Sequence, residues 1–122
     1  LIPTAIGHKL PEDVTLRESG YSHAWQTVQQ GHAVANACFL AAVNRVGVEQ
    51  SPGGPEGINF WGQSFVADPF GRVVAQAPPD REKVLVCSID LDQIRDMREG
   101  WSFPYRDRRV DAYGGLTSLF LD

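Results

Sequence analysis

The sequence predicts an α/β fold in which a helix joins two buried strands and a β-hairpin follows. The runs Leu1–Ile6 and Cys38–Val43 are short and apolar, as in strands that are covered on both faces. Between them, residues from Ser22 to about Asn36 show the three- and four-residue spacing of a helix. The segment Asp68–Gly71 has proline second and glycine fourth, which favours a type I turn.

The first strand is closed by Gly7, and the polar stretch from His8 to Gly20 predicts a surface loop. Ser22 is the expected N-cap of the helix. Its packed face is expected to consist of Trp25, Val28, His32 and Ala35, with His32 as a hydrogen-bonded core histidine. The interior Gly31 is unfavourable in a helix, so we expect a closely packed neighbour there.

The second half of the chain predicts three more strands and a short helix. After Asn44–Gly47 ends the preceding strand, Ser51–Gly57 forms a turn-rich loop. The strand Ile58–Ala67 then pairs with Arg72–Ala77 as a hairpin, and Lys83–Ile89 forms another strand. Asp90 and Gln93 resemble a capping box for a helix that reaches Met97.

Two helices cannot cover both faces of a sheet built from these apolar strands. The sequence therefore predicts that residues 1–122 are a fragment, cut in mid-strand at Leu1. Another part of the same protein, or another subunit, would supply the missing cover.

Charge and hydropathy exclude several classes of partner. The formal net charge is −4 and the pI is near 5.3, which argues against a nucleic-acid or anionic-membrane surface. The basic cluster Arg106–Arg109 is diluted by Asp107 and Asp111 and is expected to be either solvated or turned toward another subunit. No apolar run approaches the ~20 residues of a membrane span, and the start does not resemble a signal peptide. The expected location is the cytoplasm.

The residues that could carry chemistry show no catalytic constellation. Cys38 and Cys87 lie in apolar runs and are expected to be buried free thiols. The three histidines, His8, His23 and His32, lack the spacing of a metal pair on a helix. We therefore predict no catalytic residue, no metal site and no cofactor within this sequence.

Asn44 is the most suggestive polar residue because it ends a buried strand, where α/β proteins place ligand sites. An equally good interpretation is that its amide bonds to the loop that it opens. Thr4 ends the other strand, and one helix joins the two, which predicts a right-handed parallel crossover. Thr4 and Asn44 should then face one cavity, with Cα atoms within about 10 Å, roughly two strand spacings.

Five motifs in order resemble the nitrilase superfamily of carbon–nitrogen hydrolases, and in particular its N-carbamoylputrescine amidase branch. The resemblance covers essentially the whole chain. The motifs are PTAIG (Pro3–Gly7), QGHAVAN (Gln30–Asn36), AAVNRVG (Ala41–Gly47), FWGQSFVADPFG (Phe60–Gly71) and YRDRRVDAY (Tyr105–Tyr113). The sequence His8-Lys9-Leu10 departs from the family pattern in a loop beside the pocket.

The resemblance implies a four-layer αββα sandwich, of which this chain is the C-terminal part. It implies hydrolysis of N-carbamoylputrescine or a similar N-carbamoyl amine or linear amide. In that family a Cys thiolate attacks the carbamoyl carbon, a Glu acts as base, a Lys stabilises the oxyanion, and ammonia leaves before water releases the adduct. None of these three residues maps onto this sequence. By resemblance, Pro3, Thr4, Ala5 and Asn44 would bind substrate.

Two classes of function remain open at this point. The chain is either part of an amidohydrolase or a non-catalytic truncated relic or interaction module that folds only by association. In either case we expect the chain alone to be inactive and to form a homo-oligomer or to join its missing half.

Overall fold

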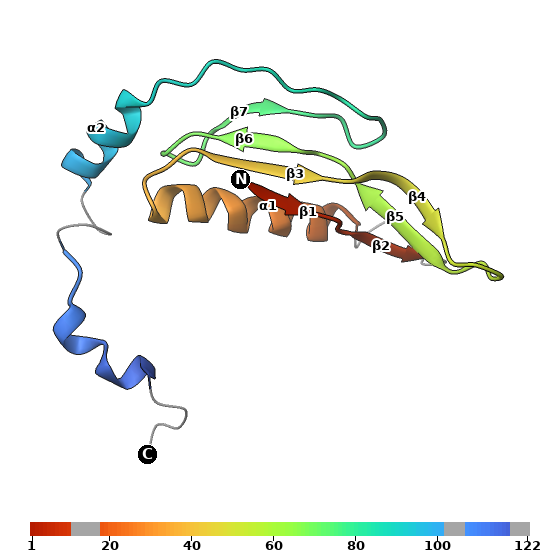
Figure 1. Cartoon of the computed structure of the whole chain (residues 1–122), viewed down its shortest axis with the longest axis horizontal. Coiled ribbons are helices and arrows are strands. Elements are labelled where there is room, and N and C mark those ends of the chain that lie inside the picture. Colours follow the sequence, from red (N-terminus) through yellow and green to blue (C-terminus); the bar gives the residue numbers. More distant parts are fainter. Residues whose placement is uncertain (11–17, 102–106, 118–122) are drawn as a thin grey trace.

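The computed structural model describes residues 1–10, 18–101 and 107–117, and these residues form an α/β arrangement of two sheets and a long helix (Figure 1). A four-stranded sheet has the order β1-β3-β6-β7, from β1 (Ile2–Thr4), β3 (Leu40–Asn44), β6 (Phe65–Ala67) and β7 (Val73–Gln76). A three-stranded sheet has the order β2-β5-β4, from β2 (Gly7–Leu10), β5 (Gly57–Trp61) and β4 (Val46–Gln50).

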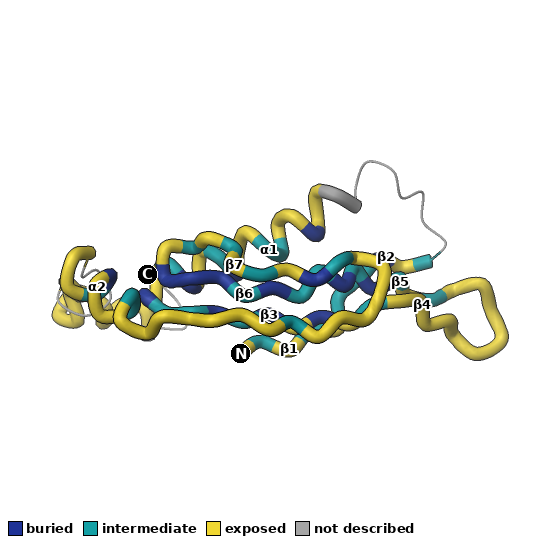
Figure 2. Tube along the Cα trace, turned by 90° about the horizontal axis from the view of Figure 1, so that it is seen from above, coloured by how far each residue is buried: buried dark blue, intermediate teal, exposed yellow. Residues whose placement is uncertain are grey.

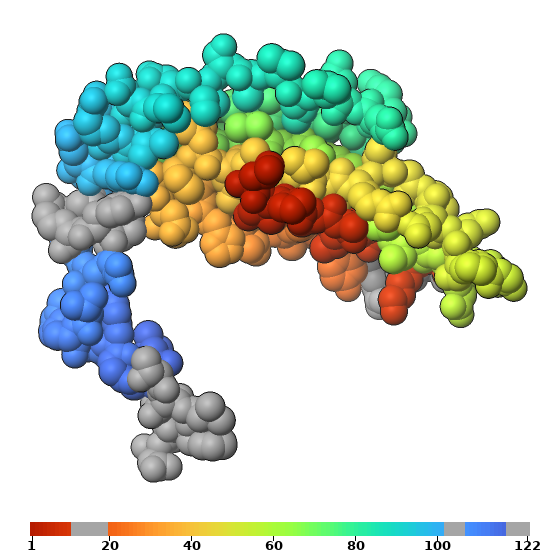
Figure 3. Space-filling view, viewed as in Figure 1, coloured from red at the N-terminus to blue at the C-terminus, as the bar shows by residue number. Residues whose placement is uncertain are grey.

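The strands β1 and β3 pair in parallel, as the sequence predicts for a crossover unit, and both β2 and the long helix α1 (Glu18–Ala35) lie between them in the chain. A second helix, α2 (Asp92–Gly100), and two short 3-10 turns, η1 (Val110–Ala112) and η2 (Gly114–Thr117), complete the described elements. In the space-filling view the blue residues 107–117 lie away from the body of the molecule (Figure 3).

The hydrophobic core lies between α1 and one face of the four-stranded sheet (Figure 2). It contains Ala33 from the helix and aliphatic or aromatic residues from β3 and β6, namely Leu40, Ala42, Phe65 and Ala67. The indole of Trp25 meets the Phe65 ring edge-on at 5.6 Å between centroids. The core is small for a chain of this size, which limits the free energy that burial can contribute.

The helix differs from its prediction in both start and orientation. It begins at Glu18, so Ser22 is a buried residue inside the helix and not its N-cap. Gln29 and Ala33 are buried, whereas Val28 is 61% exposed and His32 is exposed, so His32 is not a core histidine in this structure. A Cβ at Gly31 would meet nothing within 4 Å, and the expected close neighbour is absent among the described residues.

The predicted strand Ile58–Ala67 is two strands that belong to different sheets. The chain leaves the three-stranded sheet after Trp61 and enters the four-stranded sheet at Phe65. The break between the two strands occurs at Gly62 (φ +60°) and Gln63 (φ +56°), which both have left-handed backbone conformations. The strands β2 and β4 were not predicted, because their sequences GHKL and VGVEQ lack a clear apolar pattern.

The prediction of a strand at Lys83–Ile89 is wrong for this chain, since these residues form no strand. No residue of this segment pairs with a described strand, and Val84 and Val86 are 82% and 90% exposed. The capping box is also not formed. The Asp90 carboxylate accepts the Asp92 N–H at 3.0 Å, but Gln93 Oε1 has no hydrogen-bond partner.

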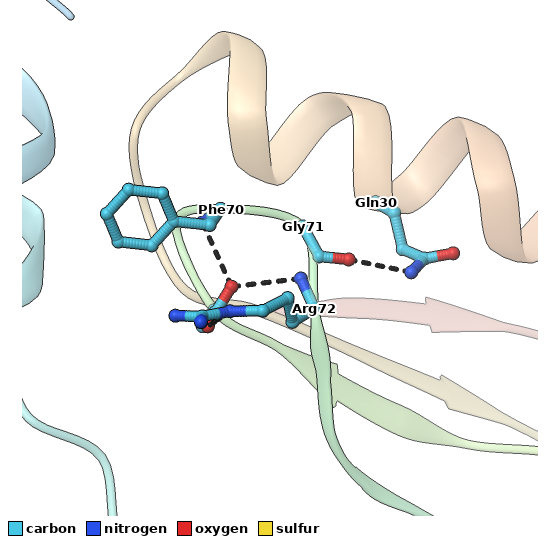
Figure 4. Close-up of polar contacts among 5 residues, drawn as sticks. Gln30, Phe70, Gly71 and Arg72 are labelled. Atoms are coloured by element: carbon cyan, nitrogen blue, oxygen red, sulfur yellow. Dashed lines mark hydrogen bonds and ion pairs between the residues drawn. The ribbon is translucent and has the colours of Figure 1, made fainter.

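The predicted hairpin is confirmed for β6 and β7, which pair antiparallel across a turn at Asp68–Gly71. The Gly71 N–H donates to the Asp68 carbonyl at 2.9 Å, and the turn is fixed to α1 because Gln30 Nε2 donates to the Gly71 carbonyl at 2.7 Å (Figure 4). Gly71 has φ +79°, and a Cβ there would lie 2.8 Å from Val34 Cγ2, so a side chain does not fit.

The Asp68 carboxylate holds this turn together from inside. Asp68 is only 3% exposed. Its Oδ1 accepts the N–H groups of Phe70 and Arg72, both at 2.9 Å, and its Oδ2 accepts from Arg72 Nε at 2.7 Å. A buried carboxylate that accepts several bonds stabilises its turn strongly, and two backbone donors would be left unpaired without it.

We therefore expect Asp68→Ala to lower the free energy of unfolding by about 2–4 kcal/mol. Arg72→Ala is the matched control. The Arg72 side chain is 69% exposed, so its removal should cost less than about 1 kcal/mol. Denaturant unfolding of each single variant, made in the same polypeptide, measures the two losses in the free energy of unfolding. Equal losses would mean that the ion pair, and not the backbone bonds, stabilises the turn.

Candidate functional site at the ends of β1 and β3

The side chain of Asn44 joins the ends of β1 and β3. Its Oδ1 accepts the Ile6 N–H at 2.9 Å and the Thr4 hydroxyl at 3.0 Å, and its Nδ2 donates to the Ile6 carbonyl at 3.0 Å. The Asn44 carboxamide thus makes the same two hydrogen bonds with the Ile6 backbone that a peptide group of an adjacent strand would make. This arrangement extends the contact between the strands beyond Thr4, where β1 ends.

Ser64 binds the backbone of the same residue from the side of β6. The Asn44 N–H donates to Ser64 Oγ at 2.9 Å, and Ser64 Oγ lies 3.2 Å from the Asn44 carbonyl, to which its hydroxyl donates. Asn44 is 8% exposed. Asn44 therefore connects three chain segments. Its side chain bonds to Thr4 and Ile6, and its backbone bonds to Ser64.

Two cavities flank this junction. One, of about 370 Å³, is lined by Asn44, Arg45, Ser64, Lys83 and residues around Pro78. The other, of about 460 Å³, is lined by His8, Trp61, residues of α1 and Pro79. Gln63 lines both cavities. Concave spaces at the carboxyl ends of parallel strands are the usual ligand sites of α/β folds.

The larger cavity has an aromatic wall. His8 is buried on β2, with its ring centroid 5.0 Å from that of Trp61 and 6.2 Å from that of Tyr21. His8 belongs to a strand and not to the loop predicted from the sequence. The lining of the smaller cavity is more basic, because it includes Arg45 and Lys83. Arg45 lies over the Phe60 ring at 4.3 Å and forms a salt bridge of 2.7 Å with Glu49.

Of the four residues expected to bind substrate, Thr4 and Asn44 lie together. They are register partners in the parallel pair, so their Cα atoms are about one strand spacing apart, within the predicted limit. Ala5 lines a third cavity of about 400 Å³ with Arg45, Glu49 and Phe60. Pro3 is exposed and alternates with Thr4, so it points to the opposite face of the sheet.

Sequence reasoning missed Gln63 and Ser64 at this site. Ser64 lies inside the predicted strand Ile58–Ala67, and no local signal marks a serine that binds a distant backbone. The dipeptide Gly62-Gln63 carried a partial signal, because a glycine within an apolar strand indicates a bulge or a break.

The remaining candidate groups do not assemble into a reactive site. Among the described residues no group of three or more His, Cys, Asp or Glu side chains is placed to hold a metal ion. Both cysteines are free. Cys38 is half-buried and Cys87 is exposed, so the expectation of a buried thiol fails for Cys87. Within the described ranges, no helix is long and apolar enough to cross a membrane.

The arginine-rich tail shows one well-defined pair. Arg109 binds the carboxylate of Asp111 through Nε (2.9 Å) and Nη2 (2.6 Å), and this contact lowers the pKa of Asp111. This bidentate Arg–Asp pair is made within the chain. Arg106, part of the basic cluster for which a subunit contact was one expectation, lies outside the described residues.

Comparison with known families gives one match over most of the chain. The family model described as "Carbon-nitrogen hydrolase" matches residues 4–99. N-carbamoylputrescine amidases from Arabidopsis thaliana and Solanum tuberosum are 44% and 45% identical over 119 residues, or 96% of this chain. A citrullinase from Francisella tularensis is 32% identical over 98% of the chain.

Solved structures agree with the sequence relatives. A carbon–nitrogen hydrolase from Helicobacter pylori G27 superimposes with a TM-score of 0.87 and 42% identity, and the match covers 97% of this chain and 40% of that one. A CN-hydrolase superfamily protein from Xanthomonas campestris gives a TM-score of 0.59 at 30% identity over 70% of this chain. The chain spans only 38% of the length of the plant relatives named above.

Proposed function

The chain belongs to the carbon–nitrogen hydrolase family, and from this premise we propose that it is the C-terminal portion of an enzyme that cleaves the carbamoyl C–N bond of an N-carbamoyl amine. The observation that carries this proposal is the 44–45% identity to N-carbamoylputrescine amidases along nearly the whole chain. In this proposal the nucleophilic Cys thiolate, the Glu base and the oxyanion-binding Lys come from the remainder of the polypeptide.

The part of the enzyme formed by this chain would be a wall of the substrate pocket. Thr4 and Asn44 hold the ends of β1 and β3 at fixed positions, and the cavities beside them lie where the substrate would enter. Pro3 and Ala5 remain candidates for substrate contacts from the same segment. A homo-oligomer and a role in polyamine biosynthesis are further parts of the proposal.

Two alternatives follow from specific observations. The similarity to a citrullinase favours a ureido amino acid as a second substrate candidate. The second alternative is a non-catalytic relic or interaction module. It rests on the absence from this sequence of any residue that matches the catalytic Glu, Lys or Cys.

The deciding experiment is an assay of the complete polypeptide that contains this sequence. With N-carbamoylputrescine we expect release of both ammonia and putrescine, and citrulline and linear amides serve as competing substrates. The isolated 122-residue chain should show no turnover. No hydrolysis of any of these compounds by the complete polypeptide would favour the relic. Turnover by the isolated chain that disappears on mutation of Cys38 or Cys87 would contradict the proposed division of the site.

A further inference from the structure

Gln63 has an unfavourable backbone conformation that the turn itself does not require. Its φ of +56° lies in the left-handed region, which a glycine adopts with less strain than a glutamine. The conformation is fixed by its surroundings. The Gly62 N–H donates to the Arg45 carbonyl at 2.8 Å, and the Gln63 N–H donates to the Pro78 carbonyl at 3.3 Å. Strained residues that their surroundings hold in place occur often at ligand sites.

The position of Gln63 is as distinctive as its conformation. Gln63 lines the cavity beside Asn44 and Ser64 and also the cavity beside His8 and Trp61. It therefore lies at the partition between the two spaces. The residue is half-buried, and its carboxamide makes no hydrogen bond to another described residue. Its donor and acceptor are thus available at the boundary of both cavities.

The tight packing of the neighbouring Gly62 accounts for the position of the Gln63 side chain. A Cβ at Gly62 would lie 2.9 Å from the carbonyl oxygens of both Pro78 and Pro79, so only glycine fits there. The chain therefore passes tightly against residues 78–79 and presents the next residue, Gln63, at the cavity boundary. A second glycine at position 63 would satisfy the backbone with less strain, so the glutamine side chain needs another explanation.

We propose that Gln63 is a substrate-contacting residue whose carboxamide binds the planar amide or ureido group of the substrate. This inference rests on the proposed function and names a group that would recognise its substrate class. A carboxamide presents one acceptor and two donor hydrogens in one plane. Its best partner is a group with a carbonyl beside an N–H, because both bonds can then form together. An ammonium group would use only the acceptor, and a carboxylate would use only the donor.

Two variants of the complete polypeptide separate this role from a structural one. Gln63→Gly removes the carboxamide and relieves the backbone, so its melting temperature should equal or exceed that of the parent. Its KM for N-carbamoylputrescine should rise about tenfold, since two hydrogen bonds are lost, while kcat stays within about threefold. Gln63→Asn tolerates the same φ and keeps the carboxamide on a shorter chain, so its KM should lie between the two. A Gln63→Gly enzyme with the KM of the parent would overturn the proposal.

A binding measurement keeps the inference testable if the proposed function fails. The complete polypeptide is titrated calorimetrically with butylurea, which carries a ureido group, and with heptan-2-one, which has a carbonyl and no N–H. If butylurea is turned over, its KM replaces its Kd. Gln63→Gly should raise the Kd of butylurea about tenfold and that of heptan-2-one less than twofold. Binding with this pattern but no turnover of any substrate would refute the proposed function alone. Equal effects on both compounds, or no preference for butylurea in the parent, would refute the role of Gln63.

Discussion

Purified alone at micromolar concentration, the 122-residue chain is expected to form an assembly heavier than its monomer mass of 13.4 kDa. Its accessible surface is 8842 Å², whereas a compact monomer of this mass exposes about 6,500 Å². The excess is comparable to the area that one partner buries in a large permanent interface. Part of this surface is apolar, and burying it would lower the free energy of the chain.

Exposed apolar groups occur on several parts of the molecule, and three of these bear on association. Val43 is exposed on β3, an inner strand of the four-stranded sheet, and Val74 is exposed on β7, an edge strand of the same sheet. The exposed flank of α1 at Val28 borders a groove that Ile2 and Ile6 also line. Val84 and Val86 project from a segment that forms no strand. Among the described residues the outer edges of β1 and β7 pair with no further strand, which adds open backbone groups to these surfaces.

Size-exclusion chromatography with light scattering measures the expected mass. Charged substitutions test the origin of the association. Val84→Lys with Val86→Lys should shift the population toward smaller species, because charges in an apolar contact are costly. Val48→Lys, at an exposed position of β4, is the control and should leave the mass unchanged. A clean 13.4 kDa monomer with a cooperative melt would show that the chain is stable without a partner.

The second large effect is expected for Asn44→Ala, which should lower the free energy of unfolding of the complete polypeptide by about 3 kcal/mol. Three hydrogen bonds of the Asn44 side chain disappear, two of them to Ile6 and one from Thr4. The Ile6 carbonyl keeps a bond from the Trp61 N–H at 3.3 Å, but the Ile6 N–H loses its partner. A loss of this size is a large share of the stability of a typical domain.

Two related variants and one site-specific measurement identify the cause. Thr4→Val removes a single hydroxyl and should cost only about 1 kcal/mol. The double variant should cost less than the sum of the two, because Thr4 and Asn44 share a bond. Hydrogen exchange of the Ile6 amide should be slow in the parent and fast in Asn44→Ala. An unchanged exchange rate at Ile6 would mean that the Asn44 amide does not hold this junction.

The parts of the fold that were predicted correctly have a strong local signal. Helical spacing located most of α1, and the Pro-x-Gly pattern located the turn between β6 and β7. The neighbouring positions of Thr4 and Asn44 also followed from topology, since one helix between two strands gives a parallel pair. For Asn44, the side-chain bonds go to Thr4 and Ile6 at the end of β1 and not to the loop that Asn44 opens, so that interpretation is wrong.

The errors arose where structure depends on distant partners. The face of α1 was misassigned because Val28 and Gln29 adjoin in sequence, and only the position of the sheet decides which is covered. Lys83–Ile89 has the composition of a strand, but a strand also needs a neighbour to pair with. Gln63 was not found because a left-handed φ at a glutamine depends on the packing of residues 78–79 against Gly62.

The ribbon of β4 and β5 gives the family a place to change length. The two strands pair over five register positions and are joined by residues 51–56, all of them exposed. The Ser51 N–H donates to the Glu56 carbonyl at 2.8 Å, so the ribbon is closed before the loop begins. Lengthening such a loop adds an entropy penalty that grows only with the logarithm of its length. Insertions at this tip can therefore vary between homologues, or accept an epitope tag, while Asn44 and its partners keep their positions.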